Sequence, residues 1–225
     1  MKKRVFYSEL AYALGILAIA MGTAFMEKAD FGMSMVVAPA YVLYLKISQT
    51  WTFITFGMME YLFQAFLLVI LMLVMRRFKA AYLFSFVTAV IYGFALDGCM
   101  AMLSRIPADP FAWRVVFYII GLLLCALGVT FMFHTYIAPE AYELIVREFS
   151  SHYQISIPKF KTAYDIVSCL TAILLSFAFF GLWHFEGVKL GTVLCALVNG
   201  WLIGMFGRIL EALFIFRDAL PLRHK

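Results

Sequence analysis

Residues 21–40, MGTAFMEKADFGMSMVVAPA, decide the fold of this chain. A long apolar run stops there at three charged residues, Glu27, Lys28 and Asp30. A Gly-Met-Ser break then leads into a second and shorter apolar segment. A membrane helix that breaks and continues as a half-length segment is a common way of building a site inside a bilayer.

The second half of the chain repeats this passage at residues 127–140, LGVTFMFHTYIAPE. Three residues of the first copy and three of the second correspond without a gap: Gly22, Phe25 and Met26 with Gly128, Phe131 and Met132. The repetition indicates two structurally related halves.

The composition is that of an integral membrane protein. Of the 225 residues, 65% are hydrophobic and 14% are charged, whereas soluble domains carry about a quarter of charged residues. Apolar runs of a length that can cross a bilayer cover residues 10–26, 52–75, 80–103, 115–133, 162–182 and 190–216. The first run is expected to be a retained span rather than a signal peptide, because no small-residue cleavage site follows it.

The basic residues orient these spans, because cytoplasmic loops carry an excess of Lys and Arg. With the N-terminus inside, twelve cations are cytoplasmic: Lys2, Lys3, Arg4, Arg76, Arg77, Lys79, Arg147, Lys159, Lys161, Arg217, Arg223 and Lys225. Five are outside: Lys28, Lys46, Arg105, Arg114 and Lys189. Both termini are therefore predicted to be cytoplasmic, and the net charge of +5 calls for no nucleic-acid partner.

The predicted fold is an all-α membrane domain made of two repeats, residues 1–110 and 111–225. Each repeat has three spans and one short segment, at 35–47 and 139–149, which is too short to cross the bilayer and is expected to be re-entrant or interfacial. An odd number of crossings per repeat gives the repeats opposite orientations. The result is a 3+3 inverted repeat, an arrangement shared by many secondary transporters.

Polar residues inside the spans are the first candidates for a site, because a charged group in hydrocarbon is costly unless it is paired or faces water. Glu60 is the strongest, because it lies about 13 Å deep by helical rise and has no cation within a turn of its own helix. Gln64 lies one turn further on the same face.

The other candidates in the spans are Asp97, Asp165, Asn199 and Arg208. For the charged ones, a structural role is an open alternative: Asp97 as a cap or a partner of Arg105 or Arg114, Asp165 as a partner of Lys161, and Arg208 extending to the cytoplasm or pairing with Glu211.

The starts of the short segments are a second kind of candidate site. Free N–H groups and a positive helix end favour an anion there. Ser34, a plausible N-cap, and Gly32 mark the first start, and Thr135 and Ala138 mark the second.

No catalytic motif and no metal or cofactor motif is present. The four cysteines each lie in a different apolar run, and the four histidines lie at span ends, in loops or in the tail. We therefore expect no enzyme, no metal and no cofactor.

A stripe of small residues on the first span, formed by Ala11, Gly15, Ala18 and Gly22, is suited to close helix packing. It would serve either packing within the chain or docking of another subunit, and a homodimer is plausible for a chain of this size.

The pattern GxxxxxKADxGxS from Gly22 to Ser34 resembles the YczE/YyaS-like bacterial membrane proteins. The passages 187–192 (GVKLGT) leading into Asn199, and 164–166 (YDI), are similar too, although residues 35–37 (MVV) replace a Pro-Trp-Asp-like triplet of that family. The resemblance implies this fold and a location in the bacterial inner membrane.

These features favour a small secondary transporter or solute-binding membrane protein. Its partners would be the lipid bilayer and a small-molecule or ion substrate, its site would lie near the midplane between the repeats, and proton linkage would run through Glu60. The alternative from another class is a non-catalytic membrane subunit or accessory factor of a larger complex, with the small-residue stripe as its interface.

Overall fold

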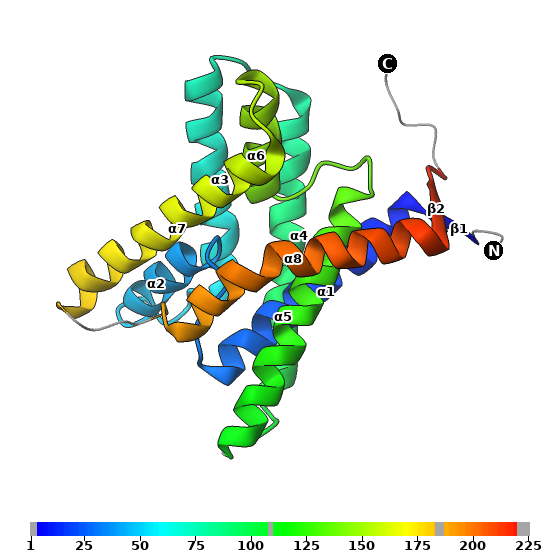
Figure 1. Cartoon of the computed structure of the whole chain (residues 1–225). Helices are drawn as coiled ribbons and strands as arrows, with labels where there is room; N and C mark the ends of the chain where they lie inside the picture. Colours follow the sequence, from blue (N-terminus) through cyan, green and yellow to red (C-terminus); the bar gives the residue numbers. More distant parts are fainter. Residues whose placement is uncertain (1–3, 108–109, 183–186, 220–225) are drawn as a thin grey trace.

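The computed structural model describes residues 4–107, 110–182 and 187–219, and this part of the chain is almost entirely helical (Figure 1). The helices are α1 (Ser8–Ala29), α2 (Ala38–Ile47), α3 (Phe56–Met75), α4 (Ala80–Leu103), α5 (Phe111–Phe133), α6 (Ala141–His152), α7 (Ile157–Phe180) and α8 (Leu190–Leu213). Two short strands, β1 (Arg4–Tyr7) and β2 (Phe214–Arg217), flank the first and the last helix.

The six predicted spans are confirmed as helices long and apolar enough to cross a membrane: α1, α3, α4, α5, α7 and α8. Their outward faces carry large apolar side chains such as Leu73 and Leu197, which are 71% and 75% exposed. Side chains of this kind on a continuous outer surface are suited to lipid rather than water. The protein is therefore a multi-pass membrane protein.

The predicted ends of the spans need small corrections, each with a local cause. Helix α3 begins at Phe56 rather than near residue 52, because the Thr55 hydroxyl caps it by accepting from Met58 N at 3.1 Å. Helix α5 begins at Phe111, four residues early, directly after its N-cap Pro110. Helix α8 ends at Leu213, because the next four residues form β2.

The two strands, which the sequence did not predict, join the ends of the described chain. β1 and β2 pair in parallel, with Arg4 opposite Phe214 and Tyr7 opposite Arg217. Ser8 strengthens the connection by donating to Asp218 Oδ1 at 2.9 Å. The start of α1 and the end of α8 consequently lie together at one end of the molecule (Figure 1). The predicted cytoplasmic cations Lys2, Lys3, Arg223 and Lys225 lie outside the described residues.

Helices α1 and α5 form the centre of the fold and cross in antiparallel directions. Gly15 lies against Gly128, and Gly22 lies against Gly121. A Cβ atom on Gly22 would come within 2.8 Å of the Gly121 carbonyl oxygen, so only glycine allows this approach. The small-residue stripe of α1 thus packs inside the chain through these glycines.

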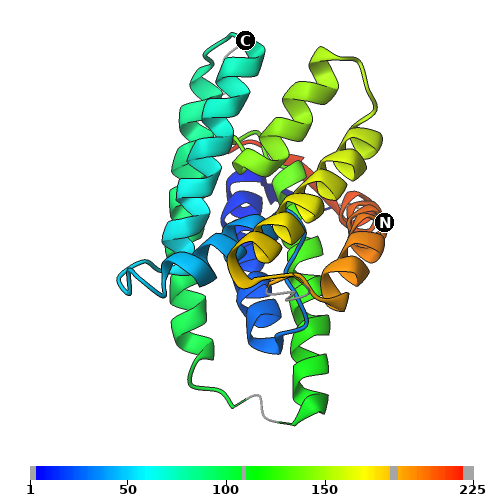
Figure 2. The ribbon, with the colours of Figure 1, turned by 90° about the vertical axis from the view of Figure 1, so that its left-hand side faces the viewer.

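The remaining spans are arranged unequally around this centre. Helices α3 and α4 form a long antiparallel pair (Figure 2) with backbone contact between Gly57 and Gly93, and α4 also packs on α1. Helix α8 packs on α5, and α7 packs on α2. In the most apolar part of each helix, 50% of the residues of α1 and of α5 are buried inside the protein, whereas only 11% of those of α7 and 17% of those of α8 are. The last two spans are therefore the least enclosed.

The two short segments are helices, α2 and α6, with bounds that differ from those predicted. Helix α2 begins at Ala38, and its N-cap is Val37, which provides no side-chain cap. Ser34 therefore does not cap α2 with its hydroxyl, although its carbonyl oxygen accepts from Ala38 N at 2.9 Å. Helix α6 runs from Ala141 to His152, so Pro139 precedes it. With 10 and 12 residues, both are roughly half the length that a bilayer requires.

Candidate functional site

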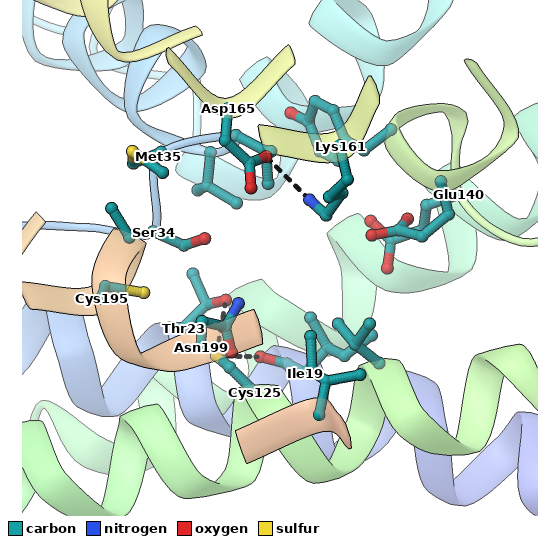
Figure 3. Close-up of a pocket in the computed structure, with 17 residues that line it drawn as sticks. Ile19, Thr23, Ser34, Met35, Cys125, Glu140, Lys161, Asp165, Cys195 and Asn199 are labelled. Carbon is teal, nitrogen blue, oxygen red and sulfur yellow. Dashed lines mark hydrogen bonds and ion pairs between the residues drawn. The ribbon is translucent and has the colours of Figure 1, made fainter. Parts of the chain in front are cut away.

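A small cavity lies beside the crossing of α1 and α5 (Figure 3). Its walls come from α1, the segment before α2, α5, the start of α6, α7 and α8. Its volume is about 40 Å³, whereas a cavity needs only about 10–15 Å³ to hold one water molecule. We call it the central cavity. Its polar lining includes Thr23, Ser34, Glu140, Tyr142, Glu143, Lys161, Asp165 and Asn199.

Two of its carboxylates come from the start of α6. Glu140 is the N-cap residue and Glu143 stands in the first turn. Their exposed fractions are only 3% and 7%. The free N–H groups and positive end of a helix stabilise negative charge at these positions, which is how this sequence can hold two acidic groups so deep. Burial, together with the neighbouring carboxylates Glu143 and Glu60, nevertheless raises the pKa of Glu140 well above its ordinary value.

Helix α3 holds the start of α6, which carries Glu140 and Glu143 and is called the acidic end of the cavity, through hydrogen bonds. Gln64 donates from Nε2 to Glu140 Oε2 at 3.0 Å and accepts at Oε1 from Ala141 N at 3.0 Å. One turn earlier, Glu60 accepts at Oε2 from the Tyr142 hydroxyl at 2.9 Å. Both α3 residues are completely buried. Glu60 is not itself part of the cavity lining, but Tyr142 is, so the phenol connects the two.

Helices α7 and α8 form further parts of the cavity wall. Lys161 donates to Asp165 Oδ1 at 2.8 Å, so the predicted ion pair is present, and both residues face the cavity (Figure 3). Asn199 of α8 also lines it. Two predicted residues from α7 and α8, Asp165 and Asn199, thus reach one site together with Ser34.

A hydrogen-bonded chain links α4 to the cavity wall. The Tyr92 hydroxyl donates to Thr23 Oγ1 at 3.1 Å, and Thr23 lies 3.9 Å from Cys125 Sγ. The cysteine thiol in turn donates to the Ile19 carbonyl oxygen at 3.9 Å. These are long sulfur contacts, and they place a thiol and a hydroxyl at the α1–α5 crossing.

The structure places Asp97 apart from the cavity, as a support for the start of α3. Its carboxylate accepts from Thr55 Oγ1 at 2.6 Å and from Gly57 N at 2.8 Å. The alternative of a cap is therefore the one observed. Arg114, expected as a possible partner, pairs instead with Asp30 at 3.0 Å.

Arg208 also lies apart from the cavity, because it does not line it and is exposed on α8. Its Nε donates to the Gly204 carbonyl oxygen at 3.2 Å. Its expected partner Glu211 lies 3.3 Å from His134 Nε2.

Gly32 has a packing role. Its φ of 112° is in the region that favours glycine, and an added Cβ would collide with Thr192 Oγ1. The adjacent Phe31 carbonyl oxygen accepts from Gly191 N at 2.8 Å, which ties this segment to the start of α8.

The expected anion site at the second short helix is occupied by protein groups. The Ala138 carbonyl oxygen accepts from Thr88, and the Thr135 hydroxyl accepts from Ile137 N at 3.2 Å. The positive end of α6 already faces Glu140 and Glu143. In the described part of the chain, no three His, Cys, Asp or Glu side chains come together in a way that could hold a metal ion.

Five polar residues of the cavity lining were not candidates in the sequence analysis: Thr23, Glu140, Tyr142, Glu143 and Lys161. The available signal was the pair of acidic residues three positions apart at the start of the second short segment. Lys161 was considered only as a partner for Asp165, on the same helix face.

The fold defines a class, that of helical multi-pass membrane proteins with six spans and a small polar cavity between them. The chain belongs to a family described as a family of unknown function (DUF6198), whose profile matches residues 6–208. This supports membership of an uncharacterised family, but not the expected YczE/YyaS-like name. No curated protein and no solved structure matches the chain.

Proposed function

We propose that this protein is a small secondary transporter or solute-binding membrane protein, with the central cavity as its site. The observation that carries the proposal is the position of the cavity: it lies at the α1–α5 crossing and takes its polar lining from both halves of the chain. Buried polar groups at such a depth are costly unless they serve a ligand or a pathway.

We further propose that the two halves form a 3+3 inverted repeat, in which α1, α2, α3 and α4 correspond to α5, α6, α7 and α8. The α1–α5 glycine contacts support it. Gly22 corresponds to Gly128 and touches Gly121, while Gly15 corresponds to Gly121 and touches Gly128. Such an exchange of partners is what a two-fold axis between two copies produces.

Other contacts agree with the same axis. Ile19 and Cys125, which are 106 positions apart, meet at the crossing itself. The packing of α4 on α1 has its counterpart in α8 on α5, and α2 on α7 has its counterpart in α6 on α3. The short helices would be re-entrant, entering from opposite sides, and the cytoplasmic excess of Lys and Arg supports termini inside a bacterial inner membrane.

Proton linkage through Glu60 is part of this proposal. Tyr142 lines the cavity, and its hydroxyl donates to Glu60 Oε2 at 2.9 Å. A proton on Glu60 would therefore change the hydrogen bonding of a group that faces the solute. If Glu60→Gln binds and moves solute as the wild type does across the pH range, the proton-linked version is wrong.

Thermal unfolding of the detergent-purified chain against a panel of metabolites, ions and pH values tests the proposal. A solute at 100 times its dissociation constant adds about 2.7 kcal/mol of stability, which raises the midpoint visibly. A hit that is then accumulated by proteoliposomes supports transport. A flat response to the whole panel would contradict a solute site and favour a subunit that works in a complex, which co-purification would reveal. That alternative lacks its predicted interface, because the glycines of the α1 stripe pack on α5.

A further inference from the structure

We propose that the central cavity binds a small ammonium-type cation, either ammonium itself or a primary amine of about the size of methylammonium. The inference rests on the proposed solute site and names the chemical class of its ligand.

The first observation is a pair of acceptor oxygens without donors. Glu140 Oε1 and Asn199 Oδ1 are buried, and neither has a hydrogen-bond partner among the residues that the structure describes. Both residues line the cavity, Glu140 at the start of α6 and Asn199 on α8 (Figure 3). A buried acceptor without a donor costs about 1–3 kcal/mol. A ligand that brings N–H donors would remove this cost, whereas an anion would add to it.

The second observation is the charge of the lining. Glu140, Glu143 and Asp165 supply three carboxyl groups, and Lys161 supplies one ammonium group. Lys161 is already paired with Asp165 at 2.8 Å. The charge of Lys161 also acts on Glu143, but a single cation then faces three carboxyl groups, and this excess of acidic groups favours a positively charged ligand.

The third observation is the size and the apolar part of the cavity. The volume of about 40 Å³ is small, but it exceeds the roughly 10–15 Å³ that one water molecule needs and so leaves room for a small organic cation. Ile19, Val129 and Ile203 form an apolar wall beside the polar groups. An ammonium head can thus reach the carboxylates and the amide while a methyl group contacts the wall.

The N-terminal N–H groups of the short helix α6 do not offset the preference of the cavity for a cation. An anion would use the N-terminal N–H groups of α6, but the carboxyl groups of Glu140 and Glu143 already lie there. The two carboxyl groups at the start of α6 therefore disfavour an anionic ligand there.

The test uses the full chain in detergent and measures its thermal midpoint and, by calorimetric titration, its affinity. The probes are methylammonium chloride, sodium chloride at the same concentration, methanol and sodium formate, which separate an ammonium cation from a metal cation, a neutral molecule and an anion of similar size. We expect only methylammonium to raise the midpoint.

Variants locate the binding. Glu140→Gln should weaken methylammonium binding about tenfold or more, because an amide cannot take on the negative charge that a bound ammonium group would stabilise on the Glu140 carboxyl group. Glu148→Gln is the matched control, since it lies on the same helix but pairs at the surface with Lys79 at 2.5 Å; it should bind as the wild type does. If Glu140→Gln does not fold, Glu143→Gln and Asn199→Leu take its place, and each should weaken methylammonium binding.

The outcomes separate the two proposals. If sodium chloride stabilises as much as methylammonium chloride, or if formate or methanol stabilises instead, the ammonium assignment is overturned and the solute site stands. It is likewise overturned if the folded cavity variants all bind methylammonium like the wild type. If neither these probes nor the wider panel changes the thermal midpoint, both the ammonium assignment and the proposed function as a solute-binding protein fail.

Discussion

Gln64 holds Glu140 through both ends of its amide group. Its Nε2 donates to the carboxylate and its Oε1 accepts from the next backbone N–H, each at 3.0 Å. The residue that the sequence marked as a neighbour of Glu60 is thus the one that orients an acid in the central cavity. A fixed carboxylate can recognise a ligand, because the entropy of positioning it has been lost on folding.

This contact can be measured with a double-mutant cycle. Gln64→Met should lower the free energy of unfolding by about 2 kcal/mol, because it leaves buried partners at Glu140 and Ala141 N unsatisfied. Glu140→Met made in the Gln64→Met background should cost less than in the wild type, with a coupling energy between about 0.5 and 3 kcal/mol. Thermal and denaturant unfolding of the four proteins checks this, and additive effects would show that the two side chains act independently.

The glycine crossing predicts a sharp difference between two spans. Gly22→Leu should destabilise the protein by at least about 2 kcal/mol, because its side chain meets the backbone of Gly121. Gly204→Leu is the control, since an added Cβ on this α8 glycine meets nothing within 4 Å. The control should unfold at the wild-type midpoint or above it. Equal effects of the two substitutions would contradict the α1–α5 contact.

Asp97 should matter for stability and not for binding. Asp97→Ala removes the acceptors of Thr55 and Gly57 N at the start of α3, at a cost of about 1–2 kcal/mol. Asp97→Asn keeps one acceptor and should cost less. Methylammonium affinity, measured by calorimetry at a temperature where both variants are folded, should not change; a loss of affinity would place Asp97 in the site after all.

Stability should fall as pH rises above the range in which an unfolded glutamate titrates. The pKa of Glu140 is raised in the folded protein, chiefly by burial. Between the unfolded and folded pKa values the folded state therefore binds more protons than the unfolded state, and raising the pH favours unfolding. Glu140→Gln should flatten this decline in midpoint. It should not abolish it, because Glu60 and Glu143 are buried beside Glu140.

The opposite orientation of the halves can be tested by labelling introduced cysteines with a membrane-impermeant maleimide. Ser104→Cys, after α4, should react in intact cells, and Ser151→Cys, near the end of α6, should react only after the inner membrane is opened. Both positions are exposed. The parent chain controls for its own cysteines, three of which are buried. Reaction of both variants in intact cells would contradict the proposed topology.

The six spans could be predicted because each is one continuous apolar run, and lipid requires continuity. The acidic end of the cavity could not be predicted in the same way. Glu143 lies on a short amphipathic segment, in which an acidic residue is ordinary. Its position in the same cavity as Asp165 depends on how α6 and α7 pack. The β1–β2 pairing was missed for a similar reason, since residues 4 and 214 share no local pattern.

Asp97 is the reverse case, a candidate from the sequence that has a structural role. A carboxylate near a span end has the same sequence signal whether it binds a ligand or caps a neighbouring helix, and only the position of Thr55 decides between them. Asp165 and Asn199 were candidates because intramembrane polar groups face the interior, and in the structure both line the central cavity. The sequence thus indicates which polar side chains are costly to place in a bilayer, whereas the packing of the helices determines which of them lie in the same site.

The uneven burial of the spans has a mechanical consequence. The α1–α5 crossing is closely packed through its glycines, and close packing of this kind resists deformation. Helices α7 and α8, of which only 11% and 17% is buried, would give up little contact in swinging outward. Because Lys161 and Asp165 would travel with α7 while Glu140 stays on Gln64, such a swing would open the cavity by parting its two charged walls.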